Sequence, residues 1–381
     1  MKSSLTLLFS VFFTCLAAAK VQPHTVHVAN PLNEPRSREI VEVPGVPEGH
    51  WLVHTETGEL LPSQRTYDGK LLFPVSLPAN GEARYILTPT QMPFSYNTIA
   101  CGRVYPERVD DVAWENDLVA FRAYGPALQK SGERAFGYDV WCKRATTQPV
   151  VEKRYYDELK RGITYHKDHG NGLDCYKVGP TLGAGATGLL QDGHLLYPWA
   201  YAACDILDNG PLRFTVRLTY PPRTFNGTQI IERRLISLDA HTPFNRTTVS
   251  YEGLGHGFTP VVGIVRHDHG ASRCTPNRLA YADPTDPPGK GQGTLFIGAL
   301  FPTPAAETMY LPLPPQEAKR AGAVDHLIAT FPQSANAPLT YYWGAGWSKA
   351  APATFEAWEA LQEATLRRLR APLRVQYIRG K

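Results

Sequence analysis

One six-residue segment, YHKDHG, holds the densest set of side chains in this sequence that can take part in acid–base chemistry. It places His166, Lys167, Asp168 and His169 next to one another. On a strand, His166 and Asp168 would share a face, whereas on a helical turn the two histidines would. Because buried charges must be paired or solvated, the segment predicts either a functional site or a solvated loop.

Three further clusters contain similar residue types. Residues 266–269 read RHDH, and we interpret them as a strand-end loop, with the alternative that they face the first cluster. Trp343 and Trp347 flank Gly-Ala-Gly, a pattern typical of a sheet core and also suited to stacking on sugar rings. Residues 114–117 read WEND and offer two carboxylates, although such acids often occupy turns.

The N-terminus has the pattern of an export signal. Lys2 is followed by a twelve-residue, mostly apolar stretch at 5–16 and by three alanines at 17–19. Twelve residues are too few to cross a bilayer as a helix, and no later segment is long and apolar enough. We therefore expect residues 1–19 to be a signal peptide, the mature protein to be secreted or periplasmic, and no membrane span to be present.

The overall composition argues against nucleic acid as a partner. The 39 basic and 35 acidic residues nearly balance, and no long basic run is present. Five cysteines remain after the signal, an odd number that leaves at least one without a partner in the chain. One disulfide is compatible with export, but the sequence does not assign the pairing.

Short strand-like segments separated by turn signals recur about every ten to fifteen residues. This spacing predicts a mostly β protein, a large antiparallel β-sandwich of the supersandwich kind. Residues 20–95 are expected to form an N-terminal β segment packed on a main catalytic sandwich at 96–381. Only residues 354–370 have a clear helical pattern, with Thr354 as the cap and Pro372 after the end.

Four of these motifs together resemble a known protein family. They read WENDLVAFRAYGPA, YDVWCKR, YHKDHGNGLDCY and ILDNGPLR, and the similarity extends over nearly all of the mature chain. The chain resembles bacterial exported proteins long catalogued as a domain of unknown function, which include the oligosaccharide dehydratases of ulvan breakdown. The resemblance implies a lyase that removes water from a non-reducing-end uronic acid and leaves a 4,5-unsaturated sugar.

Such a reaction needs a base for the C5 proton and an acid for the departing C4 hydroxyl. His166 or His169 is our candidate base, and the other histidine or Tyr138 is the candidate acid. The substrate is expected to be an acidic oligosaccharide, so a cation must also face its carboxylate. Lys167 or Arg144 would take that role.

Three more residues complete the predicted substrate site. Asp168 would orient a histidine by accepting its second N–H, which fixes the tautomer. Trp343 and Trp347 would provide a sugar-stacking surface. The sequence names neither the glycan nor the oligomeric state.

No cofactor is predicted, although a metal ion stays open as an alternative. His166, His169 and Asp174 could act as ligands, with His267 or His269 completing the site. Their spacing matches no strong metal-binding motif.

Two other functions compete with the lyase. A glycoside hydrolase or epimerase on a similar sandwich is one, and a hydrolase would use two carboxylates about 5–10 Å apart, with Glu115 and Asp117 as candidates. A non-catalytic glycan-binding protein is the other, and it would keep Trp343 and Trp347 without needing the YHKDHG segment.

Overall fold

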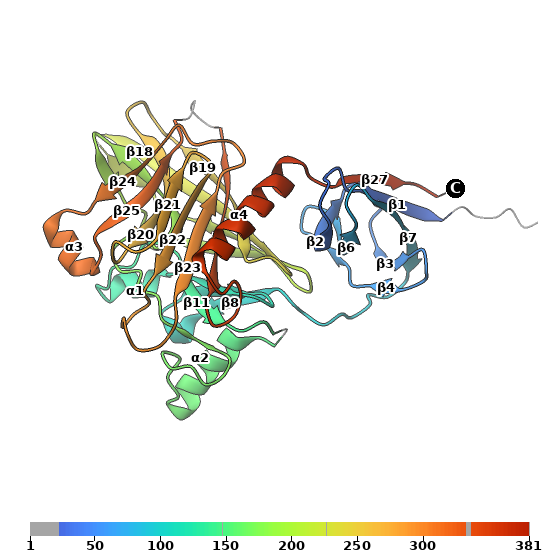
Figure 1. Cartoon of the computed structure of the whole chain (residues 1–381), viewed down its shortest axis with the longest axis horizontal. Helices are drawn as coiled ribbons and strands as arrows, with labels where there is room; N and C mark the ends of the chain where they lie inside the picture. Colours follow the sequence, from blue (N-terminus) through green and yellow to red (C-terminus); the bar gives the residue numbers. More distant parts are fainter. Residues whose placement is uncertain (1–22, 147, 226, 333–336, 381) are drawn as a thin grey trace, which may run out of the picture.

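The computed structural model describes residues 23–146, 148–225, 227–332 and 337–380, so the expected signal peptide lies outside the described residues. The chain is mostly β, as predicted (Figure 1). The prediction of a single helix is wrong. The described residues include α1 (Pro126–Lys130), α2 (Val150–Arg161) and α3 (Pro315–Ala321) before the expected α4 (Phe355–Arg370).

A small β domain forms the N-terminal part. Its two sheets consist of β1 (His24–Ala29), β3 (His50–Thr55), β4 (Leu60–Leu61), β7 (Glu82–Thr90) and β27 (Arg374–Ile378), and of β2 (Arg36–Val43), β5 (Gln64–Arg65) and β6 (Leu71–Leu77). Alternate residues such as Val26 and Val28 fill a core separate from that of the main body. Because β27 pairs with β1, residues 374–378 belong to this domain, whereas the predicted division assigned them to the main body.

Two larger sheets build the main body. The nine-stranded sheet contains β15 (Ala203–Asn209), β16 (Arg213–Thr219), β18 (Thr228–Asp239), β19 (Phe244–Glu252), β26 (Leu339–Trp347), β23 (Leu295–Leu300), β22 (Arg278–Asp283) and β21 (Ser272–Thr275), with β17 (Arg223–Phe225) beside β18. The five-stranded sheet contains β14 (His194–Leu196), β13 (Ala184–Gln191), β20 (Thr259–Arg266), β25 (Asp325–Thr330) and β24 (Glu307–Pro312). Both contribute to one apolar core, in which β13 packs against β23 and β26.

A third, smaller sheet carries most of the motif residues. It consists of β8 (Cys101–Tyr105), β9 (Asp111–Glu115), β10 (Ala120–Ala123), β11 (Asp139–Lys143) and β12 (Gly172–Asp174), with the short η1 (Pro106–Arg108) after β8. Phe121, Val140 and Cys142 enter the main core, whereas Trp141 packs with Tyr155 of α2 in a second cluster. Because side chains along a strand point alternately to its two faces, every second side chain of this sheet faces α2.

Helix α4 covers the outer face of β22 and β23 and leads the chain back to the N-terminal domain (Figure 1). Thr354 caps it as predicted, accepting a hydrogen bond from the Ala357 N–H at 3.2 Å. Trp358 and Gln362 are buried and donate to the Ile297 and Leu279 carbonyls. None of the helices in the described ranges is long and apolar enough to cross a bilayer.

Candidate active site

His166 lies on the turn between α2 and β12, where one ring nitrogen is held and the other has no hydrogen-bond partner among the described residues. Its Nδ1 is 3.1 Å from the carbonyl oxygen of Asp174. A carbonyl can only accept a hydrogen bond, so Nδ1 carries a proton, and in the neutral ring the lone pair is on Nε2. The ring packs against Tyr165 with 4.4 Å between centroids, and 63% of the His166 side chain is exposed. A solvent-accessible base is therefore held in one tautomer.

Lys167 and His169 lie on the same turn, but few contacts hold their side chains in place. Both are exposed, and neither forms a side-chain hydrogen bond or ion pair with the residues that the structure describes. Lys167 is therefore a free cation beside His166. The structure distinguishes the two histidines of the motif, because it orients only His166.

Asp168 shapes the turn and does not orient a histidine, contrary to our prediction. Its carboxylate accepts hydrogen bonds from the Gly170 and Gly172 N–H groups at 2.8 and 3.1 Å and from Arg144 at 3.0 Å. Partial burial acts in the opposite direction, yet these hydrogen bonds lower the pKa of Asp168. At Gly172, where φ is +124°, an added Cβ would lie 1.9 Å from the Cys142 carbonyl oxygen, so this turn requires glycine.

Beneath this turn, a buried arginine gathers three carboxylates, and we call these four residues the Arg122 cluster. Arg122 Nη2 donates to Asp139 and, at 2.9 Å, to Asp174, while Nε lies 3.8 Å from Asp111. Nη1 donates to the Tyr155 hydroxyl at 3.0 Å. Arg122, Asp139 and Asp174 meet because β10, β11 and β12 are neighbours whose alternate side chains face α2.

Two carboxyl groups of the cluster, those of Asp139 and Asp111, have raised pKa values. Burial raises the pKa of Asp139 to about 7, although Arg122 opposes the shift. Burial also raises the pKa of Asp111 to about 7, and one of its oxygens has no hydrogen-bond partner among the described residues. The Tyr124 hydroxyl donates to Asp139 at 3.2 Å, and burial raises the pKa of Tyr124. Tyr124 therefore stays protonated, with its hydroxyl proton directed at Asp139.

Sequence reasoning missed Arg122, Tyr124 and Asp139. The available signal was a charged residue inside the apolar strand that contains Ala120 and Phe121. A buried arginine at such a position needs carboxylate partners, which the neighbouring strands supply. The residues from three of the four motifs thus converge on one polar cluster.

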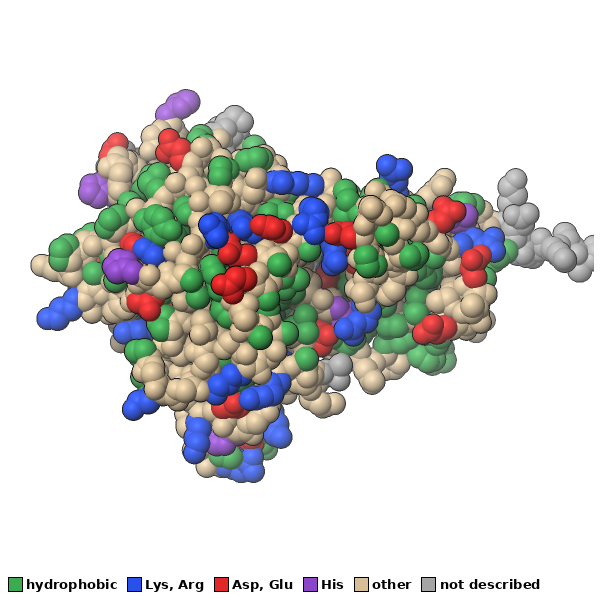
Figure 2. Space-filling view, viewed as in Figure 1, with side chains coloured by type: hydrophobic (Ala, Val, Ile, Leu, Met, Phe, Trp, Pro, Cys, Tyr) green, Lys and Arg blue, Asp and Glu red, His purple; other side chains and the backbone are tan. Residues whose placement is uncertain are grey.

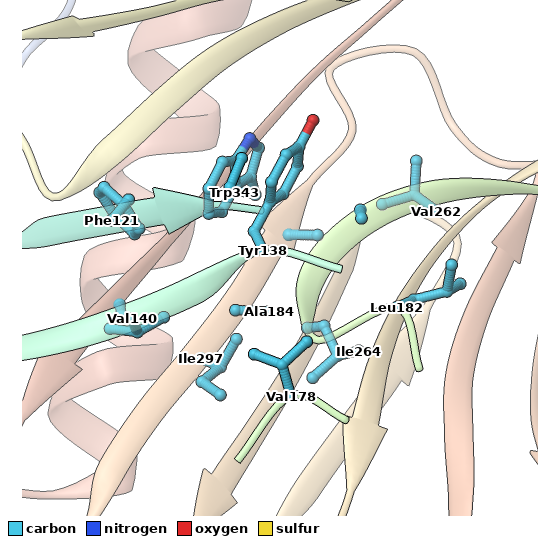
Figure 3. Packing of buried hydrophobic residues seen from close by; sticks show 14 of the residues in the cluster. Phe121, Tyr138, Val140, Val178, Leu182, Ala184, Val262, Ile264, Ile297 and Trp343 are labelled. Atoms are coloured by element: carbon cyan, nitrogen blue, oxygen red, sulfur yellow. The ribbon is translucent and has the colours of Figure 1, made fainter. Parts of the chain in front are cut away.

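The structure contradicts the proposed roles of Tyr138 and Trp343. Their rings stack inside the main core with 4.1 Å between centroids, and both side chains are buried (Figure 3). Burial also raises the pKa of Tyr138. Trp347 is buried as well, donates to the Gln292 carbonyl at 2.7 Å and lies under Arg144. None of the three presents a free face to a sugar.

The second histidine motif lies at the end of β20 and in the loop that follows it, as our interpretation of residues 266–269 as a strand-end loop predicted. Arg266 ends β20 in an ion pair with Asp325. His267 Nδ1 lies 2.6 Å from Asp283, and its ring meets that of Tyr176 at 5.7 Å. His267 Nε2 is buried and has no partner in the described part of the chain. This second acid–base pair therefore lies against Tyr176, a residue of the main core two positions after Asp174.

The carboxylates proposed for a hydrolase serve structural roles. Glu115 is buried, pairs with Lys143 at 2.6 Å and accepts the Val150 and Val151 N–H groups at the start of α2. Asp117 holds His241 through the histidine's backbone N–H and its Nδ1, both at 2.8 Å. Neither acid is free to face a substrate.

The metal alternative receives no support from the contacts of its proposed ligands. The Asp174 carboxylate binds Arg122, and His166 directs Nδ1 at a carbonyl group. Within the described ranges, no group of three or more His, Cys, Asp or Glu side chains is arranged to hold a metal ion.

His326 makes folding sensitive to acid. Its Nε2 accepts the Leu182 N–H at 3.2 Å, and burial, followed by the nearby His267, lowers its pKa to about 3. In the unfolded chain this histidine binds a proton near pH 6.5, whereas in the folded protein it does so only near pH 3. The stability that the neutral His326 contributes is therefore fully present above pH 6.5 and is lost as the pH falls toward 3. We expect wild type to lose about 2 kcal/mol more than His326→Gln between pH 7 and 5, at about 1.4 kcal/mol per pH unit.

Urea unfolding at both pH values measures this difference. His326→Gln keeps an acceptor for the Leu182 N–H but does not titrate. His194→Gln, at an exposed position of β14, is the control and should follow wild type. Parallel pH profiles for wild type and His326→Gln would contradict the assignment.

Comparison with known proteins places this chain in a family. Residues 28–375 match the family described as a domain of unknown function (DUF4861). "Uncharacterized protein P7" of Formosa agariphila is 29% identical over 284 residues, which are 68% of this chain and 71% of that protein.

Two solved structures are similar to this chain at much lower identity. A protein in glycosyl hydrolase family 38 from Enterococcus faecalis has a TM-score of 0.50 at 7% identity, over 94% of this chain and 47% of that one. An alpha-mannosidase from Enterococcus faecalis has a TM-score of 0.49 at 7% identity, over 93% and 46%. This chain spans less than half of either, and the likeness concerns the fold alone. The match over residues 28–375 establishes that the chain belongs to the DUF4861 family.

Proposed function

We propose that this protein is a carbohydrate lyase that eliminates water from a non-reducing-end uronic acid of an oligosaccharide. The observation that carries the proposal is the fixed His166 ring, with Nδ1 on the Asp174 carbonyl and Nε2 free at an accessible surface. In this proposal the oriented His166 is the base that elimination needs, and the protonated Tyr124, which donates to Asp139 of the Arg122 cluster, is the acid. The resemblance to ulvan oligosaccharide dehydratases agrees with this assignment.

The reaction divides among residues around the Arg122 cluster. His166 Nε2 takes the C5 proton, the C5–H electron pair forms the C4=C5 double bond, and the C4 hydroxyl leaves as water with a proton from Tyr124. Asp139 holds the Tyr124 hydroxyl. Lys167 faces the substrate carboxylate, because Arg144 is already paired with Asp168. Charge building up on that carboxylate in the transition state is thereby stabilised.

Hydrolysis is the alternative function, and the carboxylates around the site disfavour it. A glycoside hydrolase places two carboxyl groups on either side of the scissile bond. Asp111, Asp139 and Asp174 are all buried around one guanidinium group, and Glu115 and Asp117 are engaged elsewhere. The described part of this cluster therefore offers no exposed carboxylate pair.

We expect ultraviolet absorbance to increase when the protein is mixed with oligosaccharides that end in a uronic acid. The C4=C5 bond formed by elimination is conjugated with the C6 carboxylate and absorbs in this region, whereas a hydrolysed product does not. Mass spectrometry should show a product lighter by one water. Two fragments whose masses together equal the substrate plus one water, without absorbance, would establish hydrolysis instead, and binding without turnover would favour a glycan-binding protein.

Export forms part of the same proposal. The signal-like pattern at residues 1–19 would deliver the protein to the periplasm or the medium, where polymeric glycans are encountered.

A further inference from the structure

A cavity separates the N-terminal domain from the outer face of the nine-stranded sheet. Its volume is about 410 Å³, within the range of about 300–1,000 Å³ that ligand sites occupy. We call it the interdomain pocket and define it by Arg38, Glu42, Arg213, His241, Arg246 and Tyr342. Figure 2 shows basic, acidic and histidine side chains together in the hollow where the two domains meet.

Strand alternation explains how these side chains reach the pocket. On β19 and β26, Asn245 and Trp343 point into the main core, so the neighbouring Arg246 and Tyr342 point outward. The N-terminal domain closes the opposite wall with Glu42 of β2, which lies 3.1 Å from Arg246. Two separately folded units thus supply one set of polar groups.

His241 is the best-defined polar group of the pocket. It adopts φ +67°, a region that non-glycine residues rarely occupy. Both oxygens of Asp117 hold it, one through the backbone N–H and the other through Nδ1. Nδ1 therefore carries a proton, and in the neutral ring the lone pair is on Nε2. Strained backbone of this kind concentrates at functional sites.

The acidic side chains of the pocket are paired with arginine or lysine, whereas Arg246 and Arg38 can still bind a ligand. Interactions with Arg213, Arg246 and Lys70 outweigh the burial of Glu42 and lower its pKa to about 2. Arg246 nevertheless keeps 39% of its side chain exposed. Arg38 also lines the pocket, is exposed and forms no ion pair within the described ranges. The pocket consequently favours an anion.

We propose that the interdomain pocket binds an acidic sugar, separately from the site at His166. Arg246 and Arg38 bind the anionic group, His241 Nε2 accepts a hydrogen bond from a ring hydroxyl, and Tyr342 contacts the ring. An arginine–carboxylate pair and a fixed acceptor suit a ligand that carries both a negative charge and hydroxyl donors. A neutral sugar has the hydroxyl donors but lacks the negative charge that the two arginines would bind.

Isothermal titration of the full chain with sodium glucuronate, glucose and glucose 6-sulfate tests the proposal. We expect glucuronate to bind at least tenfold more tightly than glucose. Arg246→Met and Arg38→Met should each weaken glucuronate binding about tenfold. His241→Asn should weaken it severalfold, because asparagine tolerates positive φ and can donate to Asp117 but lacks the Nε2 acceptor.

Arg233→Met is the matched control. Arg233 lies on β18, keeps 42% of its side chain exposed and pairs with Glu252, but it does not line the pocket. Binding should be unchanged in this variant. Binding of glucose 6-sulfate would support the site and extend it to sulfate esters.

Three results would overturn the proposal: no binding of glucuronate, equal binding of glucose, or full affinity in Arg38→Met and His241→Asn. The exposed Arg38 keeps the test valid even if Arg246→Met fails to fold. His166→Asn should keep its affinity at this pocket whatever happens to turnover, so this experiment is independent of the proposed lyase activity.

Discussion

Replacing His166 by asparagine should reduce turnover of uronic-acid oligosaccharides by about 10²–10⁴-fold, the usual contribution of a positioned acid or base. Asparagine can still donate to the Asp174 carbonyl, where Nδ1 of His166 now lies at 3.1 Å. It lacks the second nitrogen, so the variant loses the base and keeps the local hydrogen bond. Initial rates followed by ultraviolet absorbance measure the effect.

His169→Asn is the matched control, three residues along the same turn. His169 is exposed and has no side-chain partner among the described residues, so its loss should leave turnover within about threefold of wild type. Both variants should unfold within a few degrees of wild type, because surface substitutions change stability little. Full activity in His166→Asn would assign the base elsewhere, with His267 and its Asp283 partner as the next candidate.

Replacing Arg122 by methionine should destabilise the protein by about 3–5 kcal/mol at neutral pH. Methionine fills similar space but leaves Asp111, Asp139 and Asp174 buried without their shared cation, and an uncompensated buried charge has a cost of this size. The difference in stability between wild type and the variant should be smaller at pH 5. In the variant these carboxyl groups hold protons that the unfolded chain releases, so stability falls as pH rises.

Urea unfolding at pH 5 and pH 8 distinguishes this prediction from a simple packing defect. Arg217→Met is the control, because Arg217 pairs with Asp205 at an exposed position, where an ion pair contributes at most about 1 kcal/mol. A loss in Arg122→Met that equals the control, or that does not change with pH, would show that the carboxylates do not depend on Arg122.

The candidate site was only partly readable from the sequence. The density of charge in YHKDHG marks an accessible turn, and the structure places that turn beside the polar cluster. The sequence could not rank His166 above His169, because the difference is a contact with the Asp174 carbonyl eight residues away. Trp343 shows the converse error, since its residue type suits both a sugar platform and the core that it occupies.

Local patterns determined the elements of this protein, and packing decided how they combine. Turn spacing and alternation fixed its mostly β character, and Thr354 marked the start of α4, because these signals act within a few residues. Alternation shows that one strand face is buried but not which surface covers it. Three features therefore depend on contacts between distant segments, which only the tertiary structure decides. They are the ion pairs of Arg122 with Asp139 and Asp174, the pairing of β27 with β1, and the interdomain pocket.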